Sequence, residues 1–124
     1  MSVNMDLWFL NVWNSVDEIA DEGFQRQAWF GIGDLIGSPS EAFNRFFSDA
    51  AMEDFIQRKD TGLNTQQLES LINLTKIMKE LSNKTPVNID TEIGGAFVDD
   101  PRWVEVREEA KKCLKNFGAG LDSR

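Results

Sequence analysis

The sequence predicts an all-α fold: a single-domain array of five to six helices with one long irregular loop near residues 83–98. Helix-capping residues mark several starts along the chain, and apolar residues recur every three or four positions after them. The length of 124 residues is typical of one domain and is enough to bury a core. We expect residues 1–118 to form the helical domain and residues 119–124 to be a frayed C-terminal tail.

The first part of the chain is expected to contain three helical pieces. The apolar stretch Leu7–Trp13 is interpreted as a first helix. Ser15-Val16-Asp17-Glu18 has the order of a capping box, with Ser at N-cap and Glu at N3, and so predicts a helix start. Gly23 interrupts that helix, and a further helical piece is expected from Phe24 to Leu35.

The clearest helix start in the sequence is at Ser38. Ser38 is expected at N-cap, Pro39 at N1 and Glu41 at N3, an arrangement that satisfies free N–H groups of the first turn. Phenylalanines then follow at helical spacing, at Phe43, Phe46 and Phe47. Residues 48–59 are expected to form another helix or a continuation of this one.

The next predicted helix begins beside Asn64 or Thr65, either of which can cap it, and runs to about Ser82. Residues 83–97 are the weakest region for helix because they contain one proline and two glycines. We interpret them as a long loop with a short extended piece at Val87–Ile89.

The last predicted helix opens with Asp100 at N-cap and Pro101 at N1. Its apolar residues fall on one stripe at helical spacing, which predicts a core-facing side. That stripe consists of Trp103, Val106, Ala110, Cys113 and Phe117. Gly118 is expected to end the helix as the C′ residue.

The charge distribution favours a basic partner. The chain carries 13 basic and 21 acidic residues, a formal charge of −8. Residues 1–60 hold eleven acids and four bases, whereas residues 61–124 hold ten acids and nine bases. Such a chain repels nucleic acid and anionic membrane, because both are bound through Lys and Arg. No basic region precedes the short first apolar stretch, so neither a signal peptide nor a membrane span is expected, and the cytoplasm is the predicted compartment.

The side chains needed for common catalytic and metal sites are scarce. The chain has no histidine and one cysteine, which excludes nucleophile–histidine systems and the usual zinc sets. Cys113 is interpreted as a small buried hydrophobic residue. Four carboxylates near the predicted loop could hold Mg²⁺ or Ca²⁺, namely Asp90, Glu92, Asp99 and Asp100. The spacing of an EF-hand is absent, and Asp100 with its neighbour Asp99 already serves the helix start. We therefore predict no catalytic residue, no metal and no cofactor.

Two acidic clusters are the candidate partner-binding residues. The first contains Asp17, Glu18, Asp21 and Glu22, in which like charges four residues apart repel by a few tenths of a kcal/mol. The second contains Asp49, Glu53 and Asp54. Each cluster is either a solvated helix face or a patch for a basic partner. Trp8 is either a core residue of the first helix or an exposed binding residue, a role that Trp often has.

Three groups of residues resemble the small helical immunity proteins of bacterial contact-dependent growth inhibition and related polymorphic toxin systems. They are Trp13-Asn14-Ser15-Val16-Asp17-Glu18 with Arg26-Gln27-Ala28-Trp29-Phe30, the set Phe43, Phe46-Phe47 and Phe55-Ile56, and Asp100-Pro101-Arg102-Trp103 with Val106 and Ala110. The resemblance spans most of the chain, and its motifs are structural. It implies no catalytic residues.

The resemblance implies a cytoplasmic protein that binds the C-terminal toxin domain of a cell-surface effector, expected as a monomer in a 1:1 complex. Such toxins are often nucleases acting on tRNA, with a basic cleft, and an EndoU-like RNase is the first expectation. The acidity of the chain suits that partner independently, because opposite charge speeds encounter. Two alternatives stay open: an acidic nucleic-acid mimic or adaptor that binds a host nucleic-acid-handling protein, and a carboxylate-based or metal-dependent enzyme.

Overall fold

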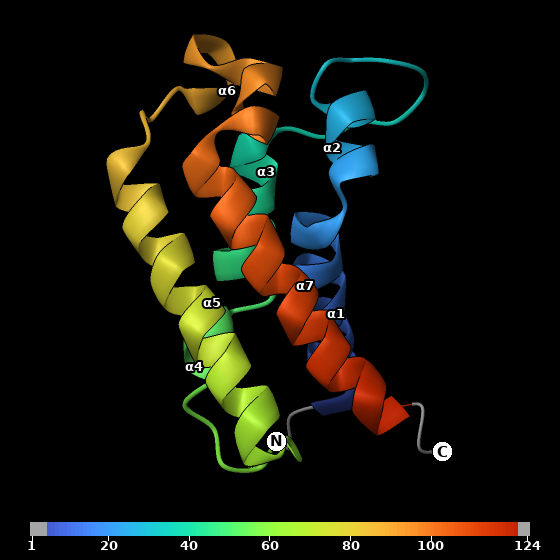
Figure 1. Ribbon diagram of the computed structural model, residues 1–124. Coiled ribbons are helices and arrows are strands. Elements are labelled where there is room, and N and C mark those ends of the chain that lie inside the picture. Colours follow the sequence, from blue (N-terminus) through green and yellow to red (C-terminus); the bar gives the residue numbers. More distant parts are fainter. Residues whose placement is uncertain (1–4, 122–124) are drawn as a thin grey trace.

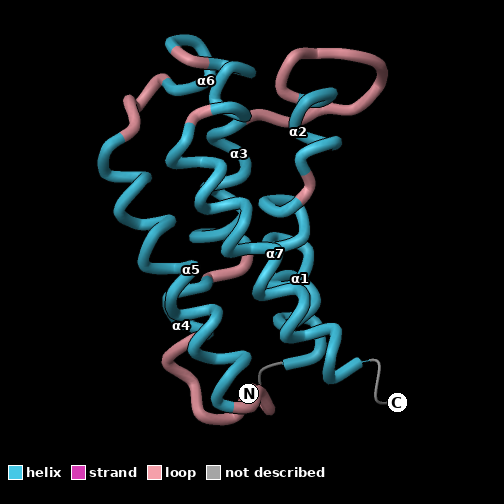
Figure 2. Tube along the Cα trace, in the orientation of Figure 1, coloured by secondary structure: helices cyan, strands magenta, loops and turns pink. Residues whose placement is uncertain are grey.

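Helices form every regular element in the part of the chain that the computed structural model describes, residues 5–121, with the backbone alone described for 119–121 (Figures 1 and 2). In chain order they are α1 (Met5–Ala20), α2 (Glu22–Ala28), α3 (Pro39–Asn44), the π-helix η1 (Arg45–Asp49), α4 (Met52–Phe55), α5 (Thr65–Lys84), α6 (Ile89–Glu92), the 3₁₀-helix η2 (Gly94–Asp99) and α7 (Pro101–Leu121). The all-α prediction is confirmed. The predicted helix number was too low, because this part of the chain holds seven α-helices.

Helix α7 organises the fold. It packs along α5 on one side and along α1 on the other, and these are the two most extensive helix contacts among the described residues. Figure 1 shows α7 in front, with α3 lying behind it. None of the described helices combines the length and apolar content needed to cross a membrane.

The predicted stripe of α7 lies in the core. Trp103, Val106, Ala110, Cys113 and Phe117 are all buried. Trp103 is at the centre of an aromatic cluster, with ring centroids 5.4 Å from Trp29, 5.8 Å from Phe43 and 5.3 Å from Phe97. These contacts join α7 to the loop after α2, to α3 and to η2. The core therefore extends to the end of the molecule where α7 begins.

Three predicted helix starts are confirmed by their hydrogen bonds. Ser38 Oγ accepts the N–H of Glu41 at 3.3 Å at the start of α3. Asn64 and Gln67 form a reciprocal capping box at α5, with distances of 2.8 and 3.0 Å. At α7, Asp100 Oδ1 accepts the N–H of Arg102 at 2.9 Å.

The predicted start at Ser15 is wrong. Ser15 is buried inside α1, because the apolar face of that helix continues through it, from Val12 to Ile19. The chain breaks instead at Asp21, whose Oδ1 accepts the N–H of Phe24 at 3.0 Å and caps α2. Gly23, predicted as an interruption, lies within α2.

Two predicted helices are shorter in the structure. The piece expected to reach Leu35 ends at Ala28, and a loop follows to Ser38. The helix expected over residues 48–59 is reduced to the end of η1 and the four residues of α4. Between them Ala51 has a φ of +45°, a left-handed conformation that stops any continuous helix.

The long loop expected near residues 83–98 contains α6 and η2, and no extended piece forms at Val87–Ile89. Ile89, Phe97 and Val98 are buried and attach this segment to the core. At the other end of the sequence, α7 continues past Gly118 to Leu121, while residues 122–124 of the predicted tail lie outside the described residues.

Candidate partner-binding surface

Helices α1 and η1 lie antiparallel to each other, which brings parts of the two acidic clusters to neighbouring elements. At one end Arg45 Nη1 donates to Glu18 Oε1 at 2.5 Å. At the other end Trp8 Nε1 donates to the carbonyl of Ala50 at 2.6 Å. Because η1 begins beside Glu18 and ends beside Trp8, its last residue, Asp49, lies toward the Trp8 end of α1.

The exposed side of α1 mixes apolar, amide and acidic side chains. Leu7 and Leu10 are 55% and 50% exposed, and Asn14 and Asp17 continue the same side of the helix toward its C-terminus. Together with Asp49 of η1, these four residues define what we call the α1–η1 face. The leucines lie toward the Trp8 end of the face, where η1 also ends with Asp49, and Asp17 lies toward the other end of α1.

The acidic charge of the first sixty residues is only partly neutralised. Three of its four bases, Arg26, Arg45 and Arg58, are held in ion pairs. Five carboxylates make neither an ion pair nor a side-chain hydrogen bond with any described residue, namely Asp6, Asp17, Asp34, Asp49 and Asp54. Two of the five belong to the α1–η1 face, which thus keeps a net negative field toward solvent.

Glu18 differs from its neighbour Asp17 because it is half-buried. Burial raises the pKa of its carboxyl; Arg45 acts in the opposite direction, and Glu41 adds to the rise. Its Oε2 atom is buried without a hydrogen-bond partner among the described residues. The side chain of Glu18 therefore mainly connects α1 to η1, and little of it is accessible to a partner.

The other two acids of the first cluster have contacts within the fold. Asp21 caps α2. Glu22 pairs with Arg26 at 2.7 Å and with Arg107 at 3.5 Å. The hydrogen bond from Arg26 lowers the pKa of Glu22, with Arg107 contributing in the same direction. A role for either acid in partner binding stays a prediction.

The second cluster divides in a similar way. Glu53 pairs with Lys79 of α5 at 3.0 Å, whereas Asp49 and Asp54 are exposed and unpaired among the described residues. Trp8 is half-buried: its ring packs edge-on against Phe55, with centroids 5.4 Å apart. Its indole N–H is already bonded to the backbone, so the observed contacts of Trp8 are internal ones.

A buried polar network escaped the sequence analysis. Gln25 is fully buried, and its Nε2 donates to the carbonyls of Glu18 and Ile19, both at 2.8 Å. Its Oε1 accepts from Trp103 Nε1 at 3.0 Å and from Arg107 Nη1 at 3.3 Å. The network joins the end of α1 to α2 and α7. The one available signal was the position of Arg107, four residues after Trp103 on the core side of its helix.

Three of the four carboxylates considered for a metal contact other groups of the fold instead. Asp90 accepts from the backbone N–H of Ser40 at 2.9 Å, Asp99 pairs with Arg26, and Asp100 pairs with Arg102. No group of three or more candidate metal ligands forms among the described residues.

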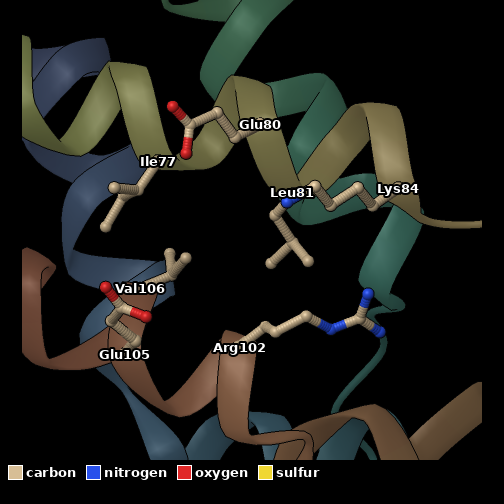
Figure 3. Close-up of a pocket in the computed structure, with 7 residues that line it drawn as sticks. All are labelled: Ile77, Glu80, Leu81, Lys84, Arg102, Glu105 and Val106. Atoms are coloured by element: carbon tan, nitrogen blue, oxygen red, sulfur yellow. The ribbon is translucent and has the colours of Figure 1, made fainter.

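Two hollows lined by described residues lie between α5 and α7. One of about 100 Å³ is shown in Figure 3 and is lined by Ile77, Glu80, Leu81, Lys84, Arg102, Glu105 and Val106. Leu81 and Val106 point into the space between the helices. Another, of about 260 Å³, is lined by Gln66, Glu69, Ser70, Asn73, Glu109, Lys112 and Asn116. Both volumes are below the range of roughly 300–1,000 Å³ typical of small-molecule sites.

Comparison of the chain with protein-family models, with curated proteins and with solved structures gave no match. The α1–η1 face is accordingly the feature on which a function has to be argued.

Proposed function

We propose that this chain is an immunity protein that binds and neutralises a basic toxin domain, an EndoU-like or other tRNA-cleaving RNase. The observation that carries the proposal is the α1–η1 face, which bears two exposed leucines and two carboxylates that are unpaired among the described residues. The resemblance of the sequence to immunity proteins of contact-dependent growth inhibition supports the same role. In this proposal the chain acts as a cytoplasmic monomer, forms a 1:1 complex and uses no cofactor.

The composition of the face suits a protein partner. Interfaces commonly combine an apolar centre with a polar rim, and Leu7 and Leu10 supply the first while Asn14 and Asp17 supply the second. An RNase needs Lys and Arg around its substrate phosphates, so its cleft presents the opposite charge. Complementary charge raises the association rate and disfavours acidic competitors.

The test reverses charge on the face and at a matched control site. The double variant Asp17→Lys/Asp49→Lys changes the α1–η1 face, and Glu69→Lys/Glu105→Lys makes the same charge change on α5 and α7. All four carboxylates are exposed and unpaired within the described part of the chain. The proposal expects a large secreted effector to be encoded directly upstream, and the binding probe is the catalytically inactive C-terminal domain of that effector.

We expect the Asp17/Asp49 variant to weaken binding by about tenfold or more at low salt, and by less as salt rises. The control variant should change affinity by a factor of about two or less. Equal effects of the two variants would mean that net charge alone matters and would contradict the assignment of this face. Binding of the chain to a host nucleic-acid-handling protein and not to the effector domain would favour the adaptor alternative.

A further inference from the structure

The loop between α2 and α3 is a second surface feature, because it exposes large apolar side chains. Figure 1 shows it projecting at one end of the molecule, beyond α2 and away from α5. We call the apolar loop the set of Phe30, Ile32, Leu35 and Ile36, whose exposed fractions are 52%, 58%, 42% and 83%. These four are half of the eight exposed large hydrophobic residues in the described part of the chain. Such a concentration of apolar surface is typical of interaction sites.

The backbone of the first half of the loop depends on two glycines and one hydrogen bond. Gly31 and Gly33 have φ values of +70° and +72°, which side-chain-bearing residues rarely adopt. The N–H of Ile32 donates to the carbonyl of Gln27 at 2.7 Å and closes the first turn. In this conformation Ile32 and Ile36 are exposed, although α2 and α3 each bury apolar residues nearby.

The base of the loop is held against η2. The ring of Phe30 lies over Gly95, so closely that a Cβ atom at position 95 would come within 2.6 Å of it. Glycine at this position allows Phe30 to pack while half of its side chain stays exposed. The apolar loop is thus a supported projection of the fold.

The charge around the apolar loop indicates the kind of partner. The first turns of α7 also lie at this end of the molecule, and their Arg102 and Arg107 are paired with Asp100 and Glu22. The other elements there, α2, the loop, α3, α6 and η2, carry six carboxylates and one base. That base is Arg26, and it is paired with Glu22 and Asp99. Asp34, inside the loop, is unpaired among the described residues. An apolar projection in an acidic surround is complementary to an apolar recess bordered by Lys and Arg.

We propose that the apolar loop inserts into an apolar recess beside the basic cleft of the toxin domain and acts as the anchor of the complex. This inference rests on the proposed function, because the partner is the same domain. An anionic bilayer or a second copy of this chain would repel the acidic surround, so a basic protein fits the loop better than either. The α1–η1 face then supplies long-range attraction, and the loop supplies short-range apolar contact.

The test uses the variant Ile32→Ser/Ile36→Ser, with Ile72→Ser as the control. Ile72 is an isoleucine of α5 that is 42% exposed, and Figure 1 shows the loop on the side of the molecule away from α5. All replaced side chains are exposed, so the variants are expected to fold, and circular dichroism checks this. The probe is the inactive C-terminal domain of the upstream effector, and affinity is measured by calorimetry at two salt concentrations.

We expect the loop variant to lose roughly tenfold to a hundredfold in affinity, mainly through faster dissociation, with little change in salt dependence. The Ile72 control should bind like the wild type. If the loop variant binds normally while Asp17→Lys/Asp49→Lys binds weakly, the proposed function stands and the anchor is refuted. If the wild-type chain does not bind the effector domain, the proposed function fails and the anchor fails with it.

Two further measurements address other occupants of the loop. Flotation with phosphatidylcholine vesicles tests a membrane, and sedimentation velocity tests a second copy of the chain. The account expects wild-type protein to stay monomeric and free of vesicles. Vesicle binding or dimer formation that disappears in Ile32→Ser/Ile36→Ser, with effector binding intact, would assign the loop to that occupant and overturn the proposal.

Discussion

Replacing Gln25 with leucine removes the centre of the buried polar network while keeping a side chain of similar size. The wild-type amide makes four hydrogen bonds, two as donor and two as acceptor. After the change, Trp103 Nε1 and the carbonyl of Ile19 have no other hydrogen-bond partner among the described residues. Arg107 keeps its bond to the carbonyl of Val98 at 3.0 Å, so its loss is partial.

The size of the effect follows from these two orphaned groups. Each buried polar group left unsatisfied costs about 1–3 kcal/mol, and a leucine in this polar setting offers no compensating contact. We therefore expect Gln25→Leu to lower the free energy of unfolding by about 2–6 kcal/mol. A domain of this size is stable by only about 5–15 kcal/mol, so its melting temperature should fall by roughly 10 °C or more.

The assay is urea unfolding followed by tryptophan fluorescence and by circular dichroism. Gln27→Leu is the control, because Gln27 lies on the same helix with an exposed side chain. The control should change stability by about 0.5 kcal/mol or less. A Gln25→Leu loss below about 1 kcal/mol would refute the reasoning, since it would mean that the orphaned groups find other partners.

Three further predictions concern single side chains. The contribution of Glu18 to stability is present below the glutamate pKa of 4.5 and is lost as pH rises through its raised folded-state pKa, so the stability of the wild type relative to Glu18→Gln should fall as pH rises above 4.5; a rise would contradict this. Burial raises the pKa of the Cys113 thiol to about 11, so maleimide should label it at neutral pH only after denaturant is added. Ser38→Ala should cost about 1 kcal/mol in thermal unfolding by removing the cap of α3, and an unchanged melting temperature would argue against that cap.

Local signals in the sequence were sufficient where one short segment decides the structure. The caps at Ser38, Asn64 and Asp100 depend on residues two or three positions apart, and all three are present in the structure. The false capping box at Ser15 shows the limit of such signals. The capping-box sequence that begins at Ser15 lies inside α1. Burial of the flanking apolar residues in a continuous helix outweighed a cap, because a helix start at Ser15 would have exposed them.

The candidate site was less predictable, because its charges are paired across long sequence separations. Glu22 meets Arg107 and Glu53 meets Lys79, and neither pairing has a local signature. Asp17 and Asp49 carry the same charge as the other acids of their clusters, yet they have no ion-pair partner within the described structure. The packing of Phe30 at the base of the apolar loop likewise depends on Gly95, which lies far along the sequence.

The most direct test of the central claim is inhibition of the upstream effector's C-terminal domain by this chain. The purified domain is assayed for tRNA cleavage while the chain is titrated from below to above one equivalent. The account predicts that cleavage falls to background at a 1:1 ratio, and that Asp17→Lys/Asp49→Lys shifts the titration to higher concentration. Cleavage that continues unchanged in an excess of folded wild-type chain would contradict the account.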